Sequence, residues 1–188
     1  SVHSGTNTGY GLIDVIREFR KDFKRLDLLH RLDKETSGCV IITKSYESLK
    51  IFQKKIKNKE INKKYLCLVK GRWNAKIKKS THRLTRDSKT VDAETHFKVI
   101  KYYKNSTLLE AELITGRYHQ IRKHCEILNH PIIGDKKYGD RALNKLYKEK
   151  GLSRIFLHAS LIKFYLNKEI IVECPLPIEL ESFLKNHN

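Results

Sequence analysis

The segment from His30 to Gly38 contains the residues whose types and spacing point most directly to chemistry. It places an arginine, Arg31, two residues before an acid, Asp33, between two segments that are typical of strands. In extended backbone, residues i and i+2 project from the same face, so Arg31 would lie beside Asp33 and keep it ionised. Catalytic groups are often found on loops braced in this way. The alternative is a surface ion pair next to an ordinary turn.

The residues around this loop predict its supports. Leu26–Leu29 is expected to form a short strand that enters the loop. Thr36-Ser37-Gly38 predicts a turn, in which Gly38 is free to adopt a positive φ. The apolar run Cys39–Ile42 then predicts a buried strand that leads away from it.

The charge balance indicates a polyanionic partner. Lysine and arginine total 39 residues against 21 for aspartate and glutamate, which gives a net charge of +18 in 188 residues. Such a surface binds nucleic acid with an affinity that falls steeply as salt concentration rises. A protein kept soluble by lysines would not need so unequal a balance.

The cysteines and histidines do not indicate a metal site. The four cysteines are far apart, and no C-x-x-C spacing is present. We therefore expect buried thiols in a reducing compartment, and a soluble cytoplasmic protein without a signal peptide or a long apolar span. His119 and His124 are five residues apart and so do not share a helical face.

Hydrophobic spacing predicts three helices, with a fourth short one after Pro177. Leu12, Val15, Ile16 and Phe19 predict a first helix over 11–19. Ser45 is a candidate N-cap for a second helix, with Leu49, Phe52 and Ile56 on its apolar face and lysines facing outward. A third helix is expected from Tyr118 to the Asn129-His130-Pro131 stop.

Strands are predicted between these helices. Tyr65–Val69 is one, and 97–103 with 108–114 predicts an antiparallel hairpin around Lys104-Asn105. A final hairpin is predicted from 156–165 and 169–173. Because strands and helices do not alternate as in βαβ units, the fold class is α+β.

Motifs along most of the chain resemble those of the RluA-type pseudouridine synthases. Gly139-Asp140-Arg141 and the insertion before Phe156 are most similar to the RluC branch. The run Leu29–Asp33 with Thr36–Gly38 resembles that family's H-R-L-D-x-x-T-S-G signature. The other matching stretches are Lys64–Gly71 (K-x-Y-L-A-L-V-x-G), Thr115–His124 (T-G-R-x-H-Q-I-R-x-H), His130–Asp135 with Tyr138-Gly139, and Leu157-His158-Ala159.

This resemblance implies a bent, mainly antiparallel sheet flanked by helices, with an active-site cleft across its middle. It implies that the chain isomerises uridines of large-subunit (23S) ribosomal RNA to pseudouridine without a cofactor or a metal. We expect residues 1–188 to be the catalytic domain, trimmed before the Val2-His3-Ser4-Gly5 stretch and lacking an S4-like RNA-binding domain. The 80–93 segment looks shorter than the corresponding family loop, and the chain is expected to act as a monomer.

The resemblance also assigns residue roles. Asp33 is the catalytic carboxylate, Arg122 is its ion-pair partner, and Tyr65 lies against the uracil for stacking or for proton removal at C5. Arg31 is then expected to occupy the place of the flipped uridine, in contrast to the pairing with Asp33 that same-face geometry predicts. The other expected substrate-binding residues are His30, Thr36, Arg117 and Gln120.

Other functions remain open at the level of sequence. The chain could be a non-catalytic RNA-binding or ribosome-assembly factor, or a pseudouridine synthase acting on tRNA. A nucleosidase or glycosylase would also use a carboxylate at C1′ and would release free uracil. A metallonuclease is disfavoured, since clustered carboxylates for Mg²⁺ are lacking.

Overall fold

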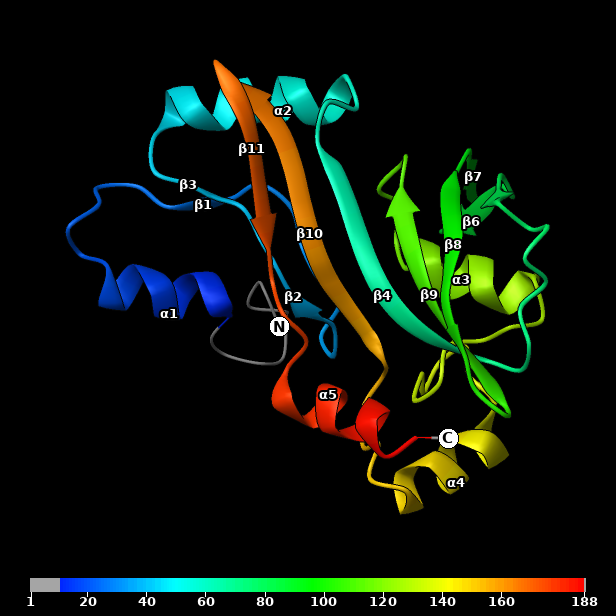
Figure 1. Cartoon of the computed structure of the whole chain (residues 1–188). Coiled ribbons are helices and arrows are strands. Elements are labelled where there is room, and N and C mark those ends of the chain that lie inside the picture. Colours follow the sequence, from blue (N-terminus) through cyan, green and yellow to red (C-terminus); the bar gives the residue numbers. More distant parts are fainter. Residues whose placement is uncertain (1–10, 188) are drawn as a thin grey trace.

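A bent sheet of seven strands forms the centre of the molecule (Figure 1). The computed structural model describes residues 11–187, so the Val2–Gly5 stretch lies outside the described residues. The strands are β2 (Ser37–Gly38), β4 (Asn62–Lys70), β5 (Lys79–Ser80), β8 (Thr95–Tyr102), β9 (Ser106–Leu113), β10 (Leu157–Leu166) and β11 (Lys168–Glu173). Their order is β11-β10-β4-β9-β8-β5, with β2 also beside β10. The pairs are antiparallel except for β2 with β10, as the α+β prediction requires.

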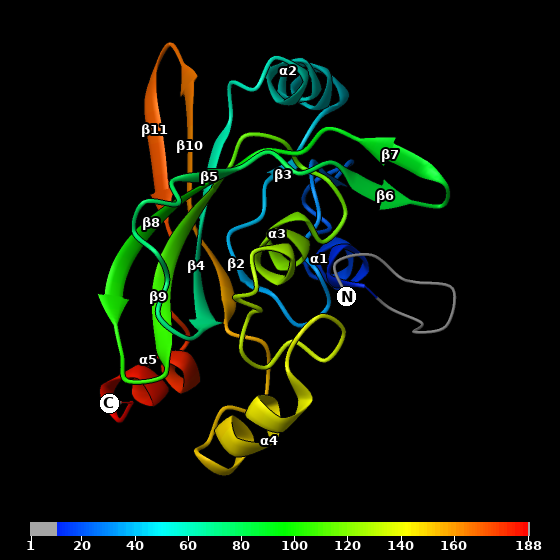
Figure 2. The same cartoon turned by 90° about the vertical axis from the view of Figure 1, so that its right-hand side faces the viewer.

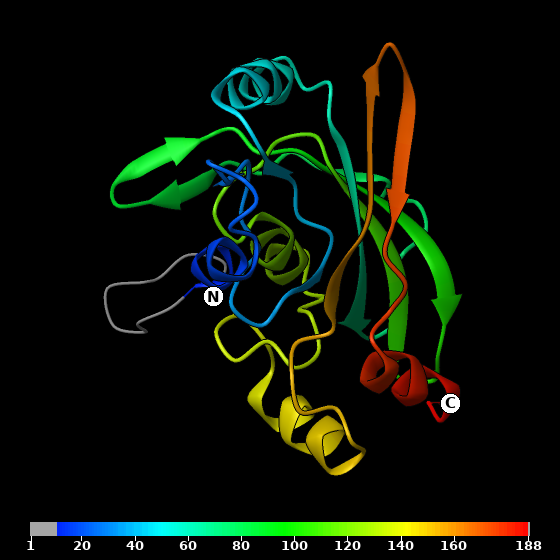
Figure 3. The same cartoon turned by 90° about the vertical axis from the view of Figure 1, so that its left-hand side faces the viewer.

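Helices and two small strand pairs surround the sheet. The helices are α1 (Leu12–Phe19), α2 (Tyr46–Lys57), α3 (Gln120–Ile127), α4 (Arg141–Glu149) and α5 (Ile178–Lys185). β1 (Asp27–Leu28) pairs with β3 (Ile42–Thr43), and β6 (Leu84–Arg86) pairs with β7 (Lys89–Val91). Figures 2 and 3 show α3 on the same side of the sheet as α1 and the β1–β3 segment. The β6–β7 hairpin extends outward from the sheet on that side. None of the helices within residues 11–187 is long and apolar enough to cross a membrane.

Several local predictions are confirmed. Ser45 caps α2, since its hydroxyl accepts a hydrogen bond from the Ser48 amide at 3.1 Å. The β8–β9 and β10–β11 hairpins form where turn residues separate the β-rich runs. Gly38 has the expected positive φ, +118°, but the turn lies at residues 34–35, and Ser37 and Gly38 form β2 and not a turn. Of the lysines expected on the outer face of α2, Lys55 is half-buried and its Nζ lies 2.9 Å from a carboxylate oxygen of Glu60.

One strand prediction about the first half of the chain is wrong. The strand expected over Cys39–Ile42 is interrupted, because β2 ends at Gly38 and β3 begins at Ile42, and these residues are half-buried. The 80–93 segment contains the β6–β7 hairpin, and its being shorter than the corresponding family loop stays a prediction. The turn residues of this hairpin, Asp87 and Ser88, have φ values of 48° and 63°, as a tight hairpin turn of type I′ requires.

Two helices and the cysteines give three further corrections. α4 was not predicted, although Asp140 caps it by accepting a hydrogen bond from the Leu143 amide. α3 begins at Gln120 and not at Tyr118, because the preceding residue, His119, is left-handed with a φ of 53°. Cys67 and Cys125 are buried as expected, whereas Cys39 and Cys174 are only half-buried.

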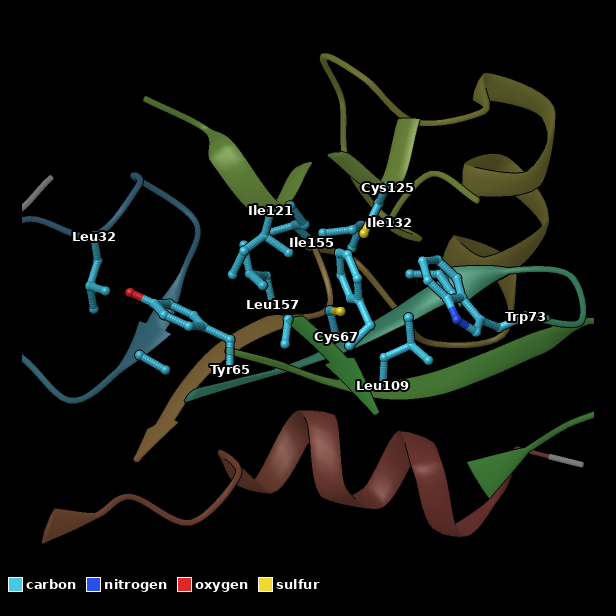
Figure 4. Close-up of a cluster of buried hydrophobic side chains, with 14 residues drawn as sticks. Leu32, Tyr65, Cys67, Trp73, Leu109, Ile121, Cys125, Ile132, Ile155 and Leu157 are labelled. Atoms are coloured by element: carbon cyan, nitrogen blue, oxygen red, sulfur yellow. The ribbon is translucent and has the colours of Figure 1, made fainter. Parts of the chain in front are cut away.

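The main hydrophobic core lies between the sheet and α3 (Figure 4). Cys67, Leu109 and Leu157 come from neighbouring strands, and Ile121 and Cys125 come from α3. Tyr65 and Leu32 lie at one end of this cluster, where the Tyr65 hydroxyl points toward the loop that carries Leu32. The core therefore extends to the loop between β1 and β2.

We predict that Gly38→Ala lowers the free energy of unfolding by about 3 kcal/mol or more, as urea denaturation would measure. An added Cβ would lie 2.2 Å from the carbonyl oxygen of Ala159, and the φ of +118° is itself unfavourable for alanine. Gly151→Ala is the matched control, because its φ is +97° but no atom lies within 4 Å of the added Cβ. It should cost about 1 kcal/mol, the cost of a Cβ in left-handed backbone, and equal losses in both variants would contradict the steric explanation.

Candidate active site

A cavity of about 700 Å³ opens where the β1–β2 loop, β4 and the start of α3 meet. This volume lies within the range of ligand pockets. Leu32, Ile61, Leu113, Ile121 and Leu157 give it an apolar wall. The predicted site residues all line it: His30, Arg31, Asp33, Thr36, Tyr65, Arg117, Gln120 and Arg122.

Asp33 and Arg122 form an ion pair within this cavity. Arg122 Nη1 donates to Asp33 Oδ2 at 3.1 Å, and the two side chains are 12% and 25% exposed. Asp33 is carried by a turn in which the Thr36 amide donates to its carbonyl, whereas Arg122 lies on α3. Because water is largely excluded, this pair is screened less than a surface ion pair. Asp33 thus presents a charged carboxylate to the cavity at a fixed place.

Arg31 does not pair with Asp33, so the prediction from same-face geometry is wrong. The backbone from Arg31 to Asp33 is not part of a strand, and the alternation of side chains therefore does not apply. Arg31 is exposed at the cavity, and its guanidinium forms no hydrogen bond or ion pair with any residue in 11–187. Its cation is available to a ligand.

Two residues that were not predicted to be catalytic complete the surroundings of Asp33. The Asp135 carboxylate, 1% exposed, accepts hydrogen bonds from Nε and Nη2 of Arg122 at 2.7 and 2.8 Å. His119 Nε2 lies 3.7 Å from Asp33 Oδ1, and its Nδ1 lies 3.1 Å from the Tyr138 hydroxyl. Burial lowers the pKa of His119 to about 4, so the ring is neutral at pH 7. Both residues belong to stretches that resemble the family's motifs, and this resemblance was the sequence signal that could have identified them.

Tyr65 lies in the middle of β4, between Leu66 and Lys64, and is 7% exposed. Burial raises the pKa of its hydroxyl, and the charge of Asp33 raises it further. The phenol is therefore protonated at neutral pH. Lys63 lies two residues earlier on the same face of β4, and burial lowers the pKa of its ammonium group. Strand alternation would have identified Lys63 as a cavity residue.

The remaining predicted residues differ in how far their side chains are already hydrogen-bonded to the protein. Gln120 is fully bonded: its Oε1 accepts from the Thr115 hydroxyl and from the Arg117 amide, and its Nε2 donates to the Glu94 carbonyl and to the Thr95 hydroxyl. These bonds leave little capacity for the substrate contact that was expected. Arg117 is exposed, and its Nε donates to the Asp92 carbonyl at 3.1 Å. The buried Thr36 Oγ1 has no hydrogen-bond partner among the described residues.

Cations and an aromatic ring surround the cavity mouth. Lys57, Lys59 and Arg86 line it together with Arg31 and Arg117. Tyr118 stacks on His119 with the ring centroids 3.6 Å apart, and the Arg86 guanidinium lies 4.4 Å from the Tyr118 ring centre. Cations that can meet phosphates and an aromatic face that can stack on a base are the usual features of sites for single-stranded nucleic acid.

The chain belongs to the RNA pseudouridylate synthase family, whose sequence model matches residues 15–127. It is 35% identical over 198 residues to the ribosomal large subunit pseudouridine synthase C of Haemophilus ducreyi, covering 97% of this chain and 62% of that protein. It is 39% identical over 176 residues to the protein of the same name from Haemophilus influenzae, covering 87% of this chain and 55% of that protein. The chain thus spans about three fifths of the length of these curated relatives.

A solved structure has the same fold. Human RNA Pseudouridylate Synthase Domain Containing 1 superposes with a TM-score of 0.75 at 22% sequence identity, over 91% of this chain and 78% of that one. The expected pseudouridine synthase fold is therefore confirmed.

His30, which supports the Asp33 loop, predicts a pH-dependent stability. Its Nε2 accepts a hydrogen bond from the Ile41 amide at 3.1 Å, and burial lowers its pKa to about 4. The unfolded chain, with a histidine pKa near 6.5, binds the proton more readily. The stability that neutral His30 provides is therefore present above pH 6.5 and is lost as the pH falls toward 4.

His30→Gln retains an acceptor for the Ile41 amide but does not titrate. We predict that its free energy of unfolding falls less than that of the parent between pH 7 and pH 5, by about 1–2 kcal/mol. Urea denaturation of both proteins at the two pH values measures this difference. An identical loss in both would show that His30 is not the titrating group.

Proposed function

We propose that this chain converts uridines of large-subunit ribosomal RNA to pseudouridine, with Asp33 as the catalytic carboxylate and without a cofactor. The single observation that carries the proposal is the ion pair of Asp33 with Arg122 inside a cavity that Tyr65 also lines. Membership of the family and the names of the relatives support it. We further propose that the protein acts as a monomer in the cytoplasm and that residues 1–188 form its catalytic domain.

The reaction exchanges one bond for another. The N1–C1′ bond of uridine breaks, the uracil turns while it stays bound, and C5 joins C1′. The proton on C5 leaves, and N1 gains a proton, so no redox equivalent is consumed. Positive charge develops at C1′ in the cleavage step, as in glycoside hydrolysis, and a carboxylate is suited to stabilise it. Asp33 either attacks C1′ or removes the 2′ proton, and both routes need its ionised form.

The cavity offers a place for an extruded base. Flipping a nucleotide costs a few kcal/mol, and stacking on an aromatic ring returns roughly 1–3 kcal/mol. We assign this contact to Tyr65, whose neutral hydroxyl can also donate a hydrogen bond. The raised pKa of Tyr65 bears on proton removal at C5, because the neutral phenol is a weak base. Its oxygen could accept the C5 proton only while its own hydroxyl proton moves to another acceptor.

The remaining cations would hold the RNA around that base. Arg31 is exposed at the cavity and is free of protein partners among the described residues, so it can occupy the place that the flipped uridine leaves. Arg117 and Thr36 lie at the same cavity and are assigned to the substrate. The net charge of +18 extends the attraction over the whole surface.

The test is release of tritium from unmodified large-subunit ribosomal RNA labelled at uracil C5. We predict that the parent releases tritium to water and forms pseudouridine, whereas Asp33→Asn is slower by at least about 10³-fold and binds the RNA with similar affinity. Asp22→Asn is the matched control, because it removes the same charge from an exposed carboxylate that pairs with Arg20. Its rate should equal that of the parent.

Each other outcome points to a different function. Equal release by the parent and Asp33→Asn would remove Asp33 from the catalytic role. Free uracil in place of pseudouridine would indicate a glycosylase. No release by the parent, with salt-sensitive RNA binding intact, would favour the RNA-binding factor, and release only from transfer RNA would identify that substrate instead.

A further inference from the structure

Asp135 is a buried carboxylate to which the proposed reaction gives no role. Its side chain is 1% exposed, and it lies on the far side of Arg122 from Asp33. Burial favours the neutral form of a carboxyl group, but hydrogen bonds from Arg122 and from two backbone amides offset this, and the pKa of Asp135 lies below its ordinary value. A buried carboxylate that the protein keeps ionised in this way needs an explanation.

The hydrogen bonds of Arg122 bear on that question. The guanidinium is planar, and its donors point in fixed directions. Nε and Nη2 make a bidentate pair with Asp135 at 2.7 and 2.8 Å, and Nη1 reaches Asp33 at 3.1 Å. Because two donors are fixed by Asp135, the plane of the group is set, and the direction of Nη1 follows from it.

Asp135 is itself held by hydrogen bonds to its carboxylate and to the backbone on either side of it. Its Oδ1 accepts hydrogen bonds from the amides of Lys137 and Tyr138 at 2.8 and 3.0 Å. The Asn144 side chain, on α4, accepts from the Gly134 amide and donates to the Asp135 carbonyl. The Ile133 amide donates to the Leu68 carbonyl on β4. The backbone that carries the carboxylate is thus tied to the central sheet and to α4.

We propose that Asp135 is a positioning residue that holds the Arg122 guanidinium in the one orientation that presents Nη1 to Asp33. Asp135 lines only the smaller, neighbouring cavity and not the one that holds Tyr65, so it acts through Arg122 and not on the substrate. This inference rests on the proposed function, because the orientation matters only if Asp33 is the catalytic group.

Asp135→Asn separates positioning from folding. The asparagine oxygen can keep the Oδ1 bonds to the Lys137 and Tyr138 amides, which preserves the turn. Its NH₂ group would face the Arg122 Nε–H, where two donors repel each other, so the bidentate pair is lost. Asp140→Asn is the matched control: it removes the same charge five residues away, and asparagine caps α4 as well as aspartate does.

The measurement is the single-turnover rate of tritium release, together with RNA affinity and the urea midpoint. We expect Asp135→Asn to lower the rate by about 10²-fold, the effect of a small misplacement of a catalytic group, and to leave RNA affinity unchanged within a factor of about three. Asp140→Asn should retain the parental rate. In a protein that already carries Arg122→Ala, adding Asp135→Asn should change the rate no further.

The outcomes separate this inference from the proposed function. A parent protein that releases no tritium would refute the proposed function. If the parent is active and Asp135→Asn releases tritium at the same rate, the positioning role is refuted. The same rate loss from Asp135→Asn with and without Arg122 would show that Asp135 acts independently of the arginine.

A signal that needs no turnover tests the orientation itself. The ¹⁵N–¹H resonance of Arg122 Nε, assigned by its loss in Arg122→Ala, should exchange slowly with water in the parent and in Asp140→Asn. It should exchange fast in Asp135→Asn. A resonance that is unchanged in Asp135→Asn would overturn the inference even if the parent were inactive.

Discussion

The sharing of Arg122 between two carboxylates is the interaction on which the site depends. Asp33 is on a loop and Asp135 is on a segment tied to the sheet, and the guanidinium connects them at 2.7 to 3.1 Å. Each charge would be costly to bury alone, and removing one partner from a buried pair commonly costs several kcal/mol. The three residues therefore form a unit, in which the position of the loop, the helix and the sheet segment are set together.

The fold supports this unit from two directions. β4 places Tyr65 at the cavity, and its carbonyl at Leu68 accepts a hydrogen bond from the segment that leads to Asp135. Gly38, which permits the close approach of β2 to Ala159 on β10, fixes the other end of the Asp33 loop. The apolar cluster between α3 and the sheet joins these supports (Figure 4). The carboxylate that we propose to be catalytic is on a loop, but the groups that orient it belong to the central sheet and the elements packed on it.

Local patterns in the sequence predicted the elements whose signals are local. The cap at Ser45 and the hairpin around Lys104-Asn105 need only neighbouring residues, and both formed as expected. α4 was not predicted, although its signals are local too: Asp140 is its cap, and Leu143, Leu146 and Tyr147 have the i, i+3, i+4 spacing of an amphipathic helix. The pairing of Arg31 with Asp33 failed because alternation of side chains holds only in strands, and the chain turns at Asp33.

The sequence allowed us to predict which residues line the site, but not which hydrogen bonds connect them. The resemblance of motifs brought Asp33, Tyr65 and Arg122 together, and the structure places them at one cavity. The bond from Arg122 to Asp135 joins residues 13 apart whose contact depends on how the segment after α3 returns to β4. No spacing rule encodes such a return, and only the folded chain shows it.

The most direct test of this account is the single-turnover rate of Arg122→Lys beside that of Arg122→Ala on the same tritiated RNA. Lysine supplies the positive charge, but its ammonium lacks the planar fork that bonds to both carboxylates at once. The account predicts that the lysine variant is nearly as slow as the alanine variant. A lysine variant that reacts at the parental rate would show that charge alone suffices, and it would contradict the claim that the orientation set by the two carboxylates governs the site.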